Sequence, residues 1–128
     1  MQTIYGPQRV FPGRLSVSRT FGDIEAKRLK LGGNPDVVIA TPEIKAFRIK
    51  PDHDFIILGC DGIFDKLESR EVVMSIWEMA LNTRHKNIHE LAGQSADVVM
   101  RGSVKKKTLD NITVVMICFE NFKKKFFP

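Results

Sequence analysis

Phe55-Ile56-Ile57-Leu58, an apolar run, leads directly into Gly59-Cys60-Asp61-Gly62-Ile63-Phe64-Asp65, and later Asp110-Asn111-Ile112-Thr113 leads into Val114-Val115-Met116-Ile117. Each stretch places a carboxylate at the end of an apolar segment with the composition of a β-strand. Two such strands lying side by side would bring Asp61 and Asp110 together. Carboxylate oxygens are the ligands that a hard divalent metal prefers, so the pattern predicts a metal site.

The composition is that of one globular domain. The chain has 128 residues, of which 43% are hydrophobic and 27% are charged, which excludes a disordered or fibrous protein. Lys and Arg exceed Asp and Glu by 20 to 15, for a net charge of +5. Part of this excess lies in Lys105–Lys107 and Lys123–Lys125, which indicate either a solvated surface or attraction for partners that carry phosphate.

Cysteine usage and the absence of long apolar runs predict a soluble, intracellular protein, cytoplasmic or nuclear. Cys60 and Cys118 lie in candidate strands without a CxxC pair, as expected for core thiols in a reducing compartment. No apolar run reaches membrane-spanning length, and Met1–Gly6 lacks the regions of a signal peptide. We therefore expect no membrane span.

Strand-like segments alternate with turn residues in the first half of the chain. Residues 1–36 are rich in Gly and Pro, which predicts loops around one short helical piece near residues 16–30. Short strands are expected at Val37–Ala40, Glu43–Ile49 and Asp54–Cys60. The last of these is apolar throughout and is typical of a central, buried strand.

Two helices and a returning strand are expected in the second half. Ser69 is a candidate N-cap for the first helix, and Asn87 with Glu90 resembles a capping box at the start of the second. The Trp and Met residues on these helices are expected to pack in the core. Residues 112–119 form a further predicted strand, so the fold class is α+β.

The aspartates also have a simpler interpretation. Asp-Gly and Asp-Asn both favour tight turns, so Asp61 and Asp110 can each be a turn former. Asp65 lies four residues after Asp61 and shares a face with it if the segment is helical, or it simply solvates the loop. Gly62 allows the backbone to come close to an ion, or only permits a positive φ.

Four segments in this order resemble protein phosphatases of the 2C type, the metal-dependent serine/threonine phosphatases. The segments are residues 13–23, 36–43, 54–65 and 110–113. The first segment departs from the family pattern at two positions, where Ser16 and Thr20 stand in place of alanine. Together they extend over nearly the whole chain, and the chain is therefore identified as the C-terminal portion of such a phosphatase domain.

The resemblance implies a function and a set of site residues. It implies hydrolysis of phosphoserine and phosphothreonine in a phosphoprotein substrate by a metal-activated water, with two Mg²⁺ or Mn²⁺ ions in the complete domain. Asp61 and Asp110 match metal-ligand positions, and Asp65 is a further candidate through a water or a third ion. Arg19 falls in the segment beside the active site, where its guanidinium meets substrate phosphate or acidic residues, or instead braces Asp23.

The resemblance also implies that part of the domain is absent. The family's bridging carboxylate, its proposed general acid histidine and its phosphate-binding arginine belong to an N-terminal half that residues 1–128 do not match, so no catalytic residue of that kind is expected here. His53, His85 and His89 lie in polar surroundings typical of surface positions. We expect one incomplete domain, the C-terminal part of a four-layer α-β-β-α sandwich with antiparallel sheets, with little activity alone and with unpaired strand edges and exposed apolar surface.

Two other functions are compatible with the sequence. One is a non-catalytic binding module that keeps the phosphatase surface for a partner. The other is a basic module that binds nucleic acid or anionic lipid through its lysine runs, but few aromatic residues interleave with those lysines, so no nucleic-acid partner is expected.

Overall fold

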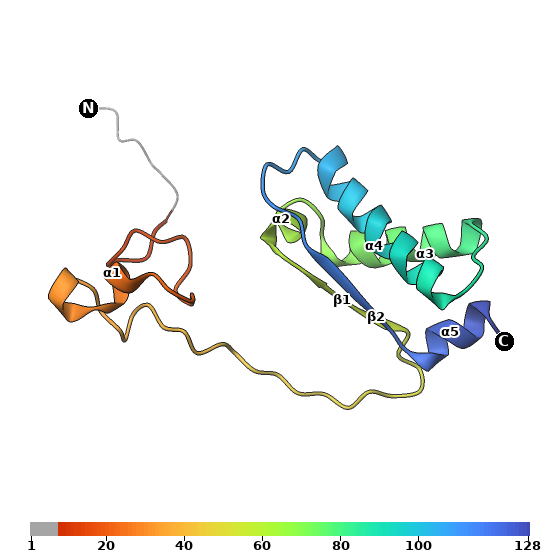
Figure 1. Ribbon diagram of the computed structural model, residues 1–128, viewed down its shortest axis with the longest axis horizontal. Coiled ribbons are helices and arrows are strands. Elements are labelled where there is room, and N and C mark those ends of the chain that lie inside the picture. Colours follow the sequence, from red (N-terminus) through yellow and green to blue (C-terminus); the bar gives the residue numbers. More distant parts are fainter. Residues whose placement is uncertain (1–7) are drawn as a thin grey trace. The chain divides into compact units, whose positions relative to one another are not determined.

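The computed structural model describes residues 8–128, which form two compact units divided between Phe47 and Arg48 (Figure 1). Residues 1–7 lie outside this range, and with them the expectation about Met1–Gly6. Within residues 8–128, none of the helices has the length and apolar character that crossing a membrane requires.

The smaller unit is built from turns around a short helical piece. Helix α1 spans Ile24–Lys27 and the 3₁₀ helix η1 spans Leu29–Leu31, which confirms the helical piece expected near residues 16–30. The buried side chains here are Ala26 and Val38. The backbone N–H of Asn34 donates to the carbonyl of Ala26 at 2.8 Å, which closes the turn that follows η1.

The first two expected strands do not form. In place of a strand at Val37–Ala40 there is a single parallel bridge between Ile39 and Arg19. Residues 43–49 have no regular structure, and Ile44 and Phe47 are 85% and 65% exposed. The predictions are wrong because β-branched and aromatic residues favour a strand only where a neighbouring strand pairs with it and buries its face.

The larger unit contains a two-stranded antiparallel sheet and four helices (Figure 1). Strand β1 pairs with β2 in a register that places Phe55 opposite Cys118 and Gly59 opposite Val114. The elements are β1 Phe55–Gly59, α2 Asp61–Phe64, α3 Ser69–Asn82, α4 Ile88–Lys105, β2 Val114–Cys118 and α5 Glu120–Phe126. The expected α+β class, both expected long helices and the last two expected strands are confirmed.

The core lies between one face of the sheet and the helices. Ile57 of β1 and Met116 of β2 pack against residues of the helices that are fully buried. Those buried residues include Ile63, Ile76, Leu91, Val99 and Phe122. Trp77 packs at the edge of the same core, which confirms the expectation for this tryptophan.

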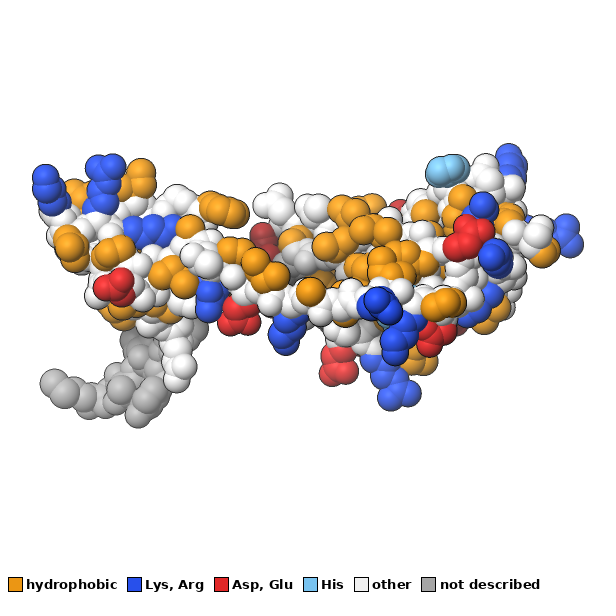
Figure 2. Space-filling view, turned by 90° about the horizontal axis from the view of Figure 1, so that it is seen from below, with side chains coloured by type: hydrophobic (Ala, Val, Ile, Leu, Met, Phe, Trp, Pro, Cys, Tyr) orange, Lys and Arg blue, Asp and Glu red, His pale blue; other side chains and the backbone are white. Residues whose placement is uncertain are grey.

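The other face of the sheet is open. Leu58, Val115 and Ile117 are 50%, 50% and 46% exposed, and Figure 2 shows hydrophobic side chains gathered over the middle of the larger unit. The register places Leu58 directly opposite Val115. The prediction of a central, buried strand at residues 54–60 is therefore wrong for residues 8–128, because β1 has one partner strand and one covered face. We call Ile56, Leu58, Val115 and Ile117 the open sheet face.

Side chains cap both long helices. Asn87 caps α4 as predicted, and its Oδ1 accepts from the backbone N–H of Glu90 at 2.9 Å. The N-cap of helix α3 is Glu68, and the predicted N-cap, Ser69, is instead the first residue of the helix. The Glu71 carboxylate accepts from the backbone N–H of Glu68 at 2.9 Å and from Lys106 Nζ at 2.6 Å. The Glu68 side chain in turn accepts from the backbone N–H of Glu71, so it satisfies a donor of the first turn as a serine hydroxyl would.

An aromatic cluster fixes the C-terminal helix α5. Phe122 is fully buried, and its ring makes edge contacts with Phe55, Trp77 and Phe126 at centroid distances of 5.1–5.2 Å. Lys125 adds an ion pair to Asp54 at 2.9 Å and lies 5.0 Å from the centre of the Trp77 ring. The cluster joins α5 to both β1 and α3.

Replacing Phe122 with alanine should therefore destabilise the larger unit strongly. Loss of the buried ring should lower the free energy of unfolding by about 3–5 kcal/mol, which urea denaturation would measure. Lys124→Ala changes an exposed side chain on the same helix and should leave that free energy almost unchanged. Equal stabilities of the two variants would contradict the packing described here.

The pH dependence of stability should include a contribution from Glu71. Hydrogen bonding by Lys106, followed by the backbone N–H of Glu68, holds the pKa of Glu71 below its ordinary value of 4.5. A depressed pKa in the folded state stabilises the protein above the ordinary value, and this stabilisation is lost as the pH falls through the folded-state pKa. Glu71→Gln should therefore flatten the acid limb of stability against pH, measured by denaturation between pH 6 and roughly pH 3, within the range where carboxylates titrate. An unchanged acid limb would contradict the assignment.

Candidate metal-binding site

Strand pairing brings the two predicted carboxylate loops together. Beyond the last paired residues, Gly59 and Val114, the backbone N–H of Cys60 still donates to the carbonyl of Thr113 at 3.3 Å. The chain then turns into α2 on one side and enters from the loop at residues 106–113 on the other. Asp61 and Asp110 therefore belong to neighbouring loops at the same end of the sheet.

Both carboxylates are exposed, and one oxygen of each accepts a hydrogen bond from the next residue. Asp61 Oδ1 accepts from the backbone N–H of Gly62 at 3.0 Å, and Asp110 Oδ1 accepts from that of Asn111 at 2.8 Å. In each case Oδ2 accepts no hydrogen bond from residues 8–128. One oxygen of each carboxylate is thus held by the neighbouring backbone, and the other has no hydrogen-bond donor among residues 8–128.

Gly62 is where the two loops touch. A Cβ added at this position would overlap the carbonyl oxygen of Asn111 and would lie 3.5 Å from Cβ of Asp110. Gly62 does not have a positive φ. The positive-φ interpretation of this glycine is therefore wrong. The backbone of Gly62 approaches the Asp110 loop, and its approach to an ion stays a prediction.

Asp65 lies one helical turn away from Asp61. It caps the C-terminal end of α2, with its backbone N–H donating to the carbonyl of Asp61 at 2.8 Å, and it is exposed. In the described part of the chain, no group of three or more His, Cys, Asp or Glu residues is arranged to hold a metal ion. The site offers two carboxylates on touching loops, a donor set that suits a hard cation that retains several waters.

Arg19 is positioned by the smaller unit. Its guanidinium donates to the carbonyl of Thr41 at 2.7 Å and pairs with Glu43 at 3.3 Å. Among residues 8–128 these are its partners, so the alternative that Arg19 braces Asp23 is wrong. Asp23 instead precedes α1 with a positive φ of 47°.

The histidines lie outside this site. His89 is exposed on α4, as expected. His85 is half-buried: its Nε2 lies 3.1 Å from the carbonyl of Ala80 and its ring meets Phe126 edge-on at 6.2 Å, so the surface position expected for it is only partly correct. His53 is also partly buried.

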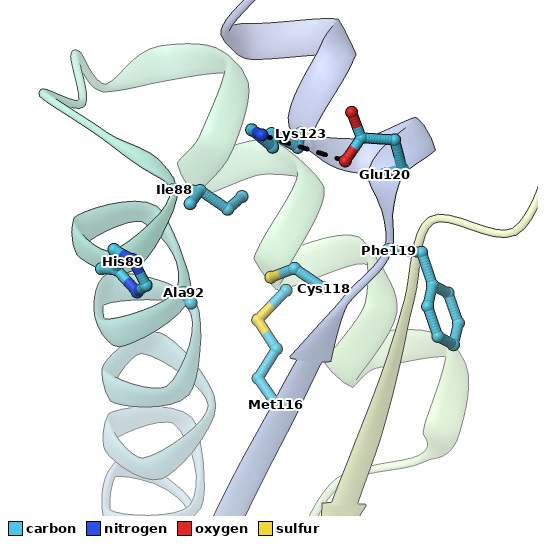
Figure 3. A pocket seen from close by; sticks show the side chains of 8 residues that line it. All are labelled: Ile88, His89, Ala92, Met116, Cys118, Phe119, Glu120 and Lys123. Atoms are coloured by element: carbon cyan, nitrogen blue, oxygen red, sulfur yellow. Dashed lines mark ion pairs between the residues drawn. The ribbon is translucent and has the colours of Figure 1, made fainter.

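A cavity that sequence reasoning did not predict lies at the other end of β2. It has a volume of about 290 Å³ and lies between the start of α4, the end of β2 and α5. Figure 3 shows Met116 and Cys118 pointing into it from the strand, with an ion pair of 3.9 Å between Glu120 and Lys123 at its rim. Burial raises the pKa of the Cys118 thiol. Helix α5, an element that no sequence pattern had indicated, contributes Glu120 and Lys123 to the lining of this cavity.

The chain matches a family of known proteins over most of its length. The family model described as "Protein phosphatase 2C" matches residues 4–112. This range includes both aspartate loops up to Ile112 and stops before β2 and α5.

Individual relatives carry the same family name. The chain is 33% identical over 120 residues to "Probable protein phosphatase 2C 72" of Arabidopsis thaliana, covering 94% of the chain and 33% of the relative. It is 36% identical over 107 residues to "Probable protein phosphatase 2C 2" of Oryza sativa subsp. japonica, covering 84% and 26%. It is 40% identical over 65 residues to "Protein phosphatase 2C 1" of Paramecium tetraurelia, and this match covers 50% of the chain and 22% of the relative. The chain thus spans about a third or less of the length of these relatives.

Replacing Gly62 with alanine tests the contact between the loops. The added methyl group would overlap the backbone of Asn111, so the loops must separate, and we expect a loss of about 1–3 kcal/mol in the free energy of unfolding. Gly93→Ala is the matched control, because Gly93 lies inside α4 with open space at its Cβ position and alanine there should stabilise the helix by about 0.5–1 kcal/mol. Stabilisation by both substitutions in thermal or urea denaturation would show that the loops do not touch.

Proposed function

The chain belongs to the protein phosphatase 2C family, and from this premise we propose that it is the C-terminal part of a metal-dependent phosphatase acting on phosphoserine and phosphothreonine in proteins. Because the chain spans about a third of its relatives' length, this activity is proposed for the complete protein. The observation that supports the proposal is the pair of exposed carboxylates, Asp61 and Asp110, on two loops that the strand pairing holds in contact.

These two carboxylates would hold Mg²⁺ or Mn²⁺. Each has one oxygen oriented by a backbone amide and the other without a donor among residues 8–128, which suits coordination by a hard cation with water completing its shell. Two such ions, when bound, supply Lewis-acid activation of water and neutralise charge on phosphoryl oxygens. Asp65, one turn from Asp61, is proposed to act through a water or to serve a third ion.

The substrate would be a phosphoprotein. Arg19 is proposed to lie on the side of the site where this substrate binds. Thr41 and Glu43 hold the guanidinium at 2.7 Å and 3.3 Å, and its side chain remains 42% exposed, so a planar donor is kept available for phosphate oxygens. The general acid and the principal phosphate-binding arginine are proposed to belong to the part of the domain that these residues do not match.

The open sheet face supports a four-layer sandwich for the complete domain. Leu58, Val115 and Ile117 expose apolar area on a sheet whose other face is covered by helices. Two sheets that pack face to face bury such surfaces against each other. We propose that a second sheet, formed by the rest of the domain, covers this face, and that residues 1–128 are the C-terminal part of that single domain.

The non-catalytic binding module remains the second candidate function. It is favoured by the exposed apolar side chains of the open sheet face, which a partner protein would cover. The two free cysteines, both partly buried, support the proposal of an intracellular, reducing location, cytoplasmic or nuclear, for either function.

Substitution of the aspartates tests the proposed activity. In the complete protein, Asp61→Asn or Asp110→Asn should lower Mn²⁺-dependent hydrolysis of a phosphothreonine peptide by about a hundredfold or more, because each removes a negatively charged ligand. The measurement is kcat/KM at saturating Mn²⁺.

Asp97→Asn is the control for the change of charge. Asp97 lies on α4 in an ion pair with Arg101 at 2.6 Å, and its substitution should leave kcat/KM unchanged. Full activity of both Asp61→Asn and Asp110→Asn would contradict the phosphatase proposal, and activity absent from the unsubstituted protein under all divalent metals would favour the binding module.

A charge placed on the open sheet face should reduce self-association of the 128-residue chain and should destabilise the complete protein. Val115→Lys should reduce self-association of the 128-residue chain, measured by analytical ultracentrifugation, because it interrupts an exposed apolar patch. In the complete protein the same substitution should lower the free energy of unfolding by several kcal/mol, on the order of the cost of an unpaired buried charge. An unchanged stability of the complete protein would show that no second sheet covers this face.

A further inference from the structure

The side chain of Cys60 joins the two loops that carry the aspartates. Its thiol donates to the carbonyl oxygen of Asn111 at an Sγ–O distance of 3.1 Å. The same sulfur accepts from the backbone N–H of Thr113 at 3.2 Å. Cys60 directly precedes Asp61, and Asn111 directly follows Asp110, so each end of this bridge is one residue from a proposed metal ligand.

We propose that Cys60 is a positioning residue, whose thiol holds the Asp61 and Asp110 loops at the spacing that the metal site requires. The inference rests on the proposed function in that it takes these two aspartates as the ligands. Groups behind metal ligands fix the orientation of those ligands, and substituting such groups commonly weakens metal affinity.

The bridge uses both hydrogen-bonding capacities of the sulfur. A thiol is a weak donor and a weak acceptor, and here one backbone carbonyl and one backbone N–H of the same loop engage it. The same two segments are also joined by a backbone hydrogen bond, in which the N–H of Cys60 donates to the carbonyl of Thr113 at 3.3 Å. A serine hydroxyl keeps both capacities on a shorter bond, whereas an alanine methyl keeps neither.

Cys118, the last residue of β2, provides a matched comparison at the opposite end of the same sheet. It is also a free, partly buried cysteine, but its side chain points into the cavity between β2 and α4 (Figure 3). It makes no contact with the aspartate loops. Removal of its thiol should change packing near α5 without changing the spacing between Asp61 and Asp110.

The experiment compares Cys60→Ala, Cys60→Ser and Cys118→Ala in the 128-residue chain by NMR. The first readout is the Mn²⁺ concentration that broadens the amide signals of Gly62 and Asn111. Cys60→Ala should raise it about tenfold, Cys60→Ser should raise it less than Cys60→Ala, and Cys118→Ala should leave it unchanged. The second readout, without metal, is the hydrogen exchange rate of the Thr113 amide, which should rise in Cys60→Ala and stay near the original rate in Cys60→Ser.

The outcomes separate this inference from the proposed function. If Mn²⁺ broadens neither loop of the unsubstituted chain, the proposed metal site fails in this chain, and the exchange rate alone then tests whether the thiol bridge exists. Unchanged Thr113 exchange in a folded Cys60→Ala variant overturns the bridge. Increased exchange together with unchanged Mn²⁺ affinity overturns the positioning role, as does an equal loss of affinity in Cys118→Ala.

Discussion

The antiparallel register of β1 and β2 is the constraint on which the rest of the larger unit depends. Pairing Gly59 with Val114 makes the next residues on each strand neighbours as well, and the Cys60 and Thr113 backbones are hydrogen-bonded at 3.3 Å. Because the side-chain period of a strand is two, a slip of one residue would also turn the helix-facing side chains to the open face. One register therefore sets both the core and the contact between the aspartate loops.

Much of this unit could be predicted because local patterns agree with the tertiary contacts. Helix α4 has a polar N-cap at Asn87 and buries Leu91 and Val99, and both signals lie within the element itself. The segments at residues 37–49 were predicted incorrectly because a strand depends on a partner that lies elsewhere in the sequence. Helix α5 is missed for a similar reason: its sequence is dominated by three lysines, and the helix is held by burial of Phe122 against Phe55 and Trp77.

The candidate site divides in the same way. Asp61 and Asp110 could be found from sequence because each stands at the boundary of an apolar run, where a carboxylate is conspicuous. Their contact through Gly62 and the thiol bridge from Cys60 could not be predicted, since a glycine and a cysteine at a strand end have many uses. Which use applies depends on the Asn111 backbone, which the fold places opposite them. The aspartates were predicted as ligands, whereas the groups that hold them together were found in the structure.

A double-mutant cycle on Mn²⁺ affinity tests most directly whether the strand pairing makes one site of the two loops. The cycle compares Asp61→Asn, Asp110→Asn and the double variant by calorimetry or by titration of a paramagnetic signal. If the two carboxylates share a site, either substitution removes most of the binding and the double variant is little worse than a single one, so the losses do not add. Additive losses would show two independent carboxylates and would contradict a shared metal site.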